Sequence, residues 1–140
     1  MMVQGILFPL FVQVALTFGL LFGMSGLRTR DVTSGKVDRR NIALREARWP
    51  PYTTQWMYAF ANEFEIPVLF YVLVCLLIPL RHADLVFVVL AWLFVLARVI
   101  RAAIHITNND VRMRGMAFGA SAVILAIMWV IFAVEIFTGT

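Results

Sequence analysis

The chain has 140 residues, of which 62% are hydrophobic and 14% are charged, and its mean hydropathy is +0.88. Soluble domains carry about 25% charged residues, so this composition excludes an ordinary soluble domain and indicates an integral membrane protein. The formal net charge is +4 at pH 7. Its arginines lack the aromatic interleaving and motifs of a nucleic-acid-binding surface, so no nucleic acid is expected as a partner and membrane-surface charge explains them better.

Four apolar segments follow one another along the chain, and each has the roughly 20 residues that a helix needs to cross the hydrocarbon core. They lie at about Ile6–Leu27, Trp56–Leu80, Leu85–Thr107 and Met116–Phe137. The sequence shows no internal repeat and no domain boundary. It therefore predicts an all-α, integral membrane four-helix bundle that forms a single domain over residues 1–140 and contacts membrane lipids.

A basic connection, residues 28–55, joins the first two spans and holds seven basic residues against three acidic ones. Within it, Asp38 is predicted to cap a short surface helix that ends before Pro50 and Pro51. Positive loops stay in the cytoplasm, and the connection between the third and fourth spans carries Arg112 and Arg114. We therefore expect the first and third loops to be cytoplasmic and both termini to lie on the opposite side.

The second span contains polar residues that a lipid-facing helix would not carry, because a charge at the bilayer centre costs at least roughly 2.5 to 3.5 kcal/mol. Asn62 and Glu65 share a stripe with Gln55 and Tyr58, at spacings of three and four residues. Glu63 would point about 160° away from Glu65 on a regular helix. The stripe is therefore expected to face another helix, with Glu63 outside it.

The third span carries a basic stripe of Arg98, Arg101 and His105, again on one helical face. At 1.5 Å per residue, Glu65 and Arg98 lie at one depth, about 13 to 15 Å from the cytoplasmic boundary. One interpretation is a buried pair, with Glu65 neutralised by Arg98, that orients the bundle without chemistry. The other is a polar pocket open to the cytoplasm, in which the surplus arginines favour an anionic ligand.

Other residue types narrow the possibilities further. No metal site is expected, because His105 has no accompanying metal ligands. Cys75 is the single cysteine, so no intramolecular disulfide can form and a buried, inert thiol is expected. Glycines spaced four residues apart, at positions 19 and 23 and at positions 115 and 119, are typical of close helix contacts. A small transporter is disfavoured, since no inverted repeat or broken helix is evident.

The polar motifs together resemble the MAPEG family, the membrane-associated proteins in eicosanoid and glutathione metabolism, especially its short bacterial members. The resemblance rests on Asn62-x-x-Glu65 shortly before a proline and an apolar run. It also rests on Ala97-Arg98 with a polar position, His105, seven residues after Arg98, and on Arg114 sixteen residues after Arg98. With four spans and a basic first loop, the likeness covers most of the chain.

The resemblance implies a homotrimer of four-helix protomers in a bacterial inner membrane. Glutathione would bind between subunits near the cytoplasmic face, without a metal, and lipophilic small-molecule substrates would arrive from the bilayer. Arg114 would help to activate the glutathione thiol by stabilising the thiolate. The residues implied to hold the tripeptide are Asn62, Glu65, Arg98 and His105, and the further candidates are Arg101, Arg28 and Arg30.

Some positions depart from the family pattern. Relatives often carry an arginine where this chain has Ala61, a tyrosine where it has His105, and hydroxyl-bearing residues where it has Gly115 and Phe118. The expected function is a glutathione-dependent transferase or peroxidase acting on lipophilic electrophiles. The alternative is a non-catalytic oligomeric membrane protein that binds a lipid, another anionic ligand or a protein partner on the same scaffold.

Overall fold

The computed structural model describes residues 3–44, 48–81, 84–108 and 110–139, and within these ranges every regular element is a helix. The helices are α1 (Val3–Thr33), α2 (Arg39–Ala43), α3 (Pro51–Asn62), α4 (Ile66–Leu77), α5 (Leu85–Ile106) and α6 (Val111–Thr138). Four stretches, formed by α1, by α3 with α4, by α5 and by α6, are long and apolar enough to cross a membrane. The prediction of an all-α protein with four spans is confirmed.

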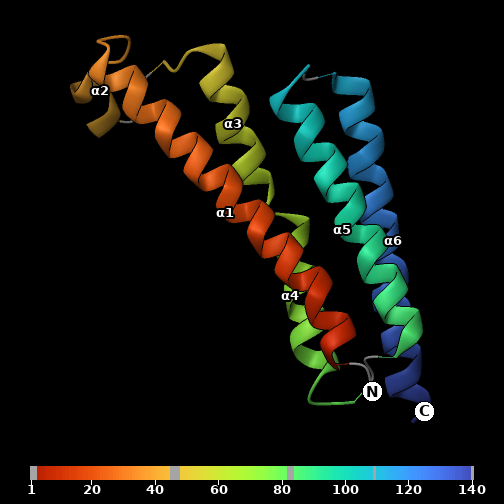
Figure 1. Cartoon of the computed structure of the whole chain (residues 1–140). Coiled ribbons are helices and arrows are strands. Elements are labelled where there is room, and N and C mark those ends of the chain that lie inside the picture. The colour runs from red at the N-terminus through yellow and green to blue at the C-terminus, as the bar shows by residue number, and fades with distance from the viewer. Residues whose placement is uncertain (1–2, 45–47, 82–83, 109, 140) are drawn as a thin grey trace.

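The four spans run lengthwise beside one another, and α5 packs against α1, α3 and α6. Both chain ends lie at one end of the molecule, and α2 with the connection to α3 lies at the other (Figure 1). This arrangement agrees with the expectation that both termini share one side of the membrane. At the α2 end, α1 and α3 diverge from α5 and α6, whereas the helices converge toward the termini (Figure 1).

Aspartate side chains fix where several helices begin. The predicted cap at Asp38 is confirmed, because its carboxylate accepts a hydrogen bond from the Arg40 N–H at 2.9 Å at the start of α2. Asp110 accepts from the Arg112 N–H at 3.0 Å and starts α6. Asp84 caps α5 in the same way. Such caps satisfy N–H groups that the first turn of a helix leaves without partners.

The second span is broken between α3 and α4, so the expectation of an unbroken helix there is wrong. Pro67 has no N–H to donate to the Glu63 carbonyl, and its ring would clash with that carbonyl in a continuous helix. The N–H groups of Glu63, Phe64 and Glu65 instead donate to carbonyls three residues earlier, at 3.0 to 3.1 Å. These tighter turns have about three residues per turn, so the break changes which side chains share a face.

Two apolar clusters hold the bundle together. The larger joins α4, α5 and α6 and the first turns of α1 near the termini, and in it the Phe70 and Phe94 rings stack at 4.7 Å. The smaller lies toward the α2 end and joins Leu20, Ala59 and Ala102. Buried polar side chains, described below, lie between these clusters along the helices. The bundle therefore encloses polar groups at mid-span, surrounded by apolar packing.

One of the predicted close glycine contacts is present within the chain. A Cβ on Gly23 would lie 2.2 Å from the Trp56 ring, so glycine is what allows α1 and α3 to approach there. A Cβ on Gly19, Gly115 or Gly119 would meet no described atom within 4 Å. Only Gly23 is therefore required by packing inside the described protomer.

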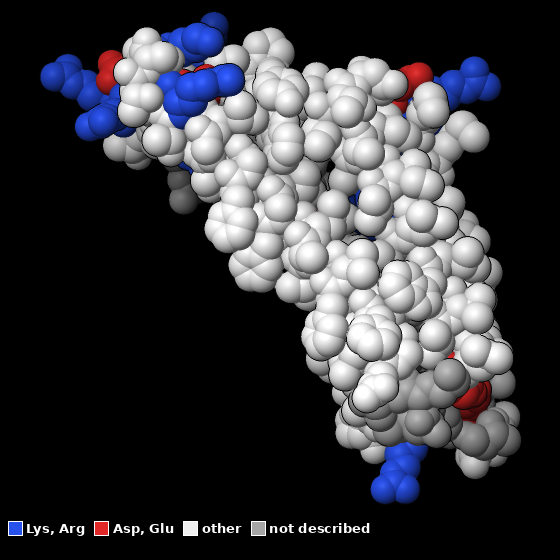
Figure 2. Space-filling model, viewed as in Figure 1, with Lys and Arg blue, Asp and Glu red and all other residues white. Residues whose placement is uncertain are grey.

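The outer surface matches a protein surrounded by lipid. Lys and Arg side chains lie mainly at the upper end of the molecule, most densely around α2, with an isolated basic side chain at the lower tip, and the visible face between is almost free of charge (Figure 2). Large apolar side chains are exposed along every span, among them Phe22, Trp92 and Val130. Cys75 is also exposed, which corrects the expectation of a buried thiol, because its position on α4 faces away from the bundle.

Candidate functional site

A fully buried arginine organises the polar centre of the bundle. Arg98 on α5 forms an ion pair with Glu63, with 3.1 Å between Nη2 and Oε1. The same Nη2 donates to the Asn62 carbonyl at 3.3 Å and to the Asn62 side-chain oxygen. Gln13 on α1 donates to the other oxygen of the Glu63 carboxylate. These bonds connect α1, the α3–α4 break and α5.

The interpretation that paired Glu65 with Arg98 is wrong, because Glu63 takes that place. Glu63 is 1% exposed, whereas Glu65 is exposed. The regular-helix projection failed because the 3₁₀ turns at 63–65 bring Glu63 toward α5. In the sequence, Pro67 indicates that break, because proline has no N–H to donate to the preceding helical turn. Gln13, a lone amide in the apolar first span, was the signal of a partner on α1.

This network has a clear energetic role. A buried charge is costly unless it is paired and hydrogen-bonded, and here Arg98 and Glu63 neutralise each other. The Nε and Nη1 atoms of Arg98 have no hydrogen-bond partner among the described residues. Arg98 donates a hydrogen bond to the Asn62 side chain from the buried interior of the bundle. It is therefore placed to position Asn62 from within the bundle.

A pocket of about 250 Å³ opens between α3, α5 and α6 beside this network. Its lining residues are Tyr58, Ala61, Asn62, Glu65, Arg101, His105 and Arg114. The structure thus brings together five of the predicted site residues: four from α3, α5 and α6, and Glu65 from the break before α4. Glu65 reaches the pocket because it lies at the break, as the residue preceding α4.

Two residues of α5 present polar atoms to this pocket. His105 is 3% exposed, and neither of its ring nitrogens has a hydrogen-bond partner among the described residues. The Arg101 guanidinium lies over the Phe118 ring, 5.4 Å from the ring centroid, in a cation–π arrangement. Its Nε also has no partner in the described part of the chain. These nitrogen atoms are buried beside the pocket and have no hydrogen-bond partner among the described residues.

The short connection from α5 to α6 sets the place of Arg114. The Thr107 hydroxyl donates to the Ala103 carbonyl at 2.6 Å where α5 ends. The Arg114 N–H donates to the Asp110 carbonyl at 2.9 Å in the first turn of α6. Arg114 lines the pocket from the first turn of α6.

The balance of charge in the pocket is positive. Arg101 and Arg114 outnumber the one carboxylate, Glu65, among the lining residues. Such a site favours an anionic ligand, because guanidinium groups pair well with carboxylates. The Glu65 carboxylate suits a positive group on the same ligand. The described residues contain no group of three or more His, Cys, Asp or Glu side chains that could hold a metal ion.

Arg28 and Arg30 lie apart from this pocket within the protomer. The Arg28 guanidinium stacks over Trp49, 4.7 Å from the ring centroid, and lines other hollows near α2. Arg30 lies 3.7 Å from the buried carboxylate of Asp31. Their part in holding glutathione stays a prediction.

The bundle and the pocket can be compared with known families. The model of the MAPEG family matches residues 6–134, nearly the whole chain. The chain belongs to the MAPEG family. Neither the curated proteins nor the solved structures contain a match to it. MAPEG membership and the four apolar spans together identify an integral membrane protein.

The positions that depart from the MAPEG pattern differ in their relation to the pocket. Ala61 lines it, so the arginine of MAPEG relatives would project there. Phe118 lies beneath Arg101. Gly115 is exposed and does not line the pocket. In this MAPEG protein, Ala61 is therefore in direct contact with the pocket, and Phe118 is related to it through Arg101.

Proposed function

We propose that the protein is a glutathione-dependent membrane transferase or peroxidase that acts on lipophilic electrophiles. The observation that carries this proposal is the pocket in which Asn62, Glu65, Arg101, His105 and Arg114 meet. These side chains come from segments that are separated in sequence, and MAPEG membership makes glutathione the first ligand to consider. The alternative of a non-catalytic binding protein has no comparable observation in its favour.

Glutathione has two carboxylates, one ammonium group and a thiol, and the pocket offers counterparts for one carboxylate, the ammonium group and the thiol. Arg101 suits a carboxylate, since its planar fork can donate two parallel hydrogen bonds. Glu65 suits the ammonium group, and the Asn62 amide suits a peptide group. Arg98 and Glu63 are proposed as positioning residues outside the pocket. Arg98 donates a hydrogen bond to Asn62, and Glu63 forms an ion pair with Arg98.

Arg114 is proposed to stabilise the thiolate of glutathione. A cation beside a thiol lowers the pKa of that thiol and raises the fraction of the nucleophilic form. His105 lines the same pocket and is proposed to help hold the tripeptide. In the transferase reaction, a sulfur–carbon bond forms while the bond to the leaving group breaks, and the leaving group departs with its electron pair. In the peroxidase reaction, two glutathione molecules supply two electrons and two protons to a hydroperoxide, giving glutathione disulfide, an alcohol and water.

The proposed assembly is a homotrimer. The pocket is open, and its 250 Å³ is below the roughly 300 to 1,000 Å³ of typical small-molecule sites. A neighbouring protomer would add the missing wall, and the apolar exterior would admit lipophilic substrates from the bilayer. We place the protein in a bacterial inner membrane with the basic loops on the cytoplasmic side.

Conjugation of glutathione to chlorodinitrobenzene by detergent-purified protein tests the activity. We expect a rate above the uncatalysed reaction, and a loss of about 100-fold in Arg114→Ala, the scale seen when a group that stabilises developing charge is removed. Arg112→Ala is the matched control, because Arg112 is an exposed arginine in the same turn and does not line the pocket. An absence of catalysis in the wild type, or equal losses in both variants, would contradict the proposal.

A further inference from the structure

A second pocket lies at the corner where α1, α2 and the segment before α3 meet. It has a volume of about 350 Å³ and shares no lining residue with the candidate glutathione pocket. Arg28 and Thr29 of α1, Arg39 and Ile42 of α2, and Trp49 contribute to its wall. An adjoining hollow of about 530 Å³ shares Arg28, Ile42 and Trp49 and adds Arg48.

The corner is held in place by buried polar contacts. Asp31 is fully buried, and the Thr53 hydroxyl of α3 donates to its carboxylate. The Asp31 carbonyl accepts hydrogen bonds from the N–H groups of Lys36, at 2.9 Å, and Val37, at 3.3 Å. Gly35, with φ of +83°, allows the turn between them. These bonds join the end of α1 to α3 and direct the chain into α2.

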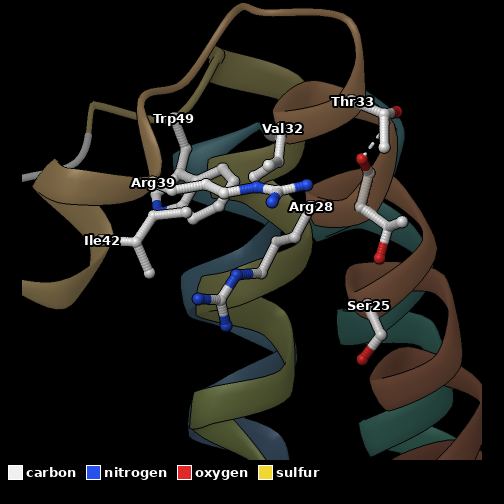
Figure 3. Close-up of a pocket in the computed structure, with 8 residues that line it drawn as sticks. Ser25, Arg28, Val32, Thr33, Arg39, Ile42 and Trp49 are labelled. Carbon is white, nitrogen blue, oxygen red and sulfur yellow. Dashed lines mark hydrogen bonds between the residues drawn. The ribbon is translucent and has the colours of Figure 1, made fainter.

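Among the described residues, the two pocket arginines have no acidic side chain beside them in the pocket wall. No aspartate or glutamate is among the lining residues of either hollow. Within the described residues, neither Arg28 nor Arg39 forms an ion pair, in contrast to Arg30. Figure 3 shows Arg39 extending from α2 toward α1 and Arg28 extending from α1 toward the α2 side. The two arginines therefore line one pocket from two different elements.

Trp49 gives this space an ordered, partly apolar wall. The Arg28 guanidinium lies over the Trp49 ring, 4.7 Å from its centroid. Stacking of this kind leaves the N–H groups in the plane of the guanidinium free to donate to an anion. Val32 and Ile42 add apolar surface to the same wall. An anion attached to an apolar body fits this combination better than a fully hydrated ion.

The position of the pocket along α1 identifies the membrane surface as the source of that anion. Arg28 lies five residues before the end of α1, about 7.5 Å at 1.5 Å per residue. The apolar stretch of the helix ends there, and Trp49 is a residue type enriched at membrane interfaces. We propose that this corner binds the phosphate of an anionic phospholipid headgroup, with Arg28 and Arg39 as its donors and the acyl chains along the outside of α1.

Equilibrium binding of phosphatidylglycerol to the detergent-purified full chain, measured by native mass spectrometry, tests the proposal. The same titration with phosphatidylcholine of equal chain length measures the preference for an anionic lipid. We expect the wild type to bind phosphatidylglycerol at least about tenfold more tightly, and Arg28→Gln with Arg39→Gln to lose that preference, since each guanidinium makes a charge-assisted contact. The single variant Arg39→Gln, at an exposed position on α2, gives a partial loss even if the double variant fails to fold.

The matched control is Lys36→Gln with Arg40→Gln, which removes the same charge from exposed residues outside the pocket. This control should keep the lipid preference. Equal losses in both double variants would overturn the proposal, because surface charge alone would then explain binding. Equally tight binding of inorganic phosphate or of water-soluble glycerophosphoglycerol would overturn the lipid as the source. If the Arg28 and Arg39 variants kept their lipid binding but bound glutathione more weakly, the corner would be assigned to glutathione instead. The lipid titration itself does not depend on whether glutathione binds at Arg114.

Discussion

Arg98 is the residue whose placement determines most of the polar centre. It is fully buried, and it contacts the Glu63 carboxylate and both oxygen atoms of Asn62. The ion pair and the pocket are therefore not alternatives in this molecule. Arg98 and Glu63 form the buried pair, and Arg101 and Arg114, one helical turn or one helix away, supply the pocket with positive charge.

Replacing Glu63 should destabilise the protein far more than replacing Glu65. Glu63→Gln leaves the buried Arg98 charge without a counter-charge, which costs about 3 to 5 kcal/mol. Glu65→Gln is the matched control, and because Glu65 is exposed we expect a change within about 0.5 kcal/mol. Reversible unfolding in mixed detergent measures both. A larger loss in Glu65→Gln would restore the pairing expected from a regular helix.

At the level of single residues, sequence reasoning identified the composition of the site better than its internal contacts. Asn62, Glu65, Arg101, His105 and Arg114 were predicted and do line one pocket. The partner of Arg98 was missed, because it depends on backbone geometry at 63–65 that a fixed 100° per residue does not describe. The family resemblance also gave no indication of Gln13, whose contact with Glu63 is long-range.

Among the elements, the break before α4 decides which side chains reach the buried network and which line the candidate pocket. It allows Glu63 to face the core while Glu65, two residues later, lines the pocket. The spanning helices could be predicted from the length of the apolar segments. The cap at Asp38 could be predicted because aspartate accepts hydrogen bonds from N–H groups at the start of a helix. The break required recognition that Pro67 removes a hydrogen bond from the preceding turn.

The contact between α1 and α3 depends on Gly23. Gly23→Ala places a methyl group against the Trp56 ring, which is itself packed against the smaller apolar cluster. Overpacking of this kind costs about 1 to 3 kcal/mol, and we expect a corresponding loss in unfolding free energy. Gly19→Ala, one turn away with no described neighbour within 4 Å, should be neutral or slightly stabilising. Equal effects of the two substitutions in the same unfolding assay would mean that the glycine contact is not required.

For the molecule as a whole, the orientation in the membrane follows from where the charges gather. The α2 end carries most of the basic side chains (Figure 2), and positive segments remain in the cytoplasm. In a Cys75→Ser background, Lys36→Cys should react with a membrane-impermeant maleimide only after the cells are opened. Thr138→Cys should react in intact spheroplasts. The reverse pattern of labelling would place the proposed glutathione pocket on the outer side.

The central claim is that the pocket between α3, α5 and α6 binds glutathione. Titration calorimetry of detergent-purified protein with glutathione measures this without requiring a turnover or a chosen electrophile. We predict saturable binding to the wild type, weakened about tenfold or more in Arg101→Gln, since one charge-assisted contact is lost, and unchanged in Arg112→Gln. No binding to the wild type at millimolar glutathione, or equal affinities of wild type and Arg101→Gln, would contradict the claim.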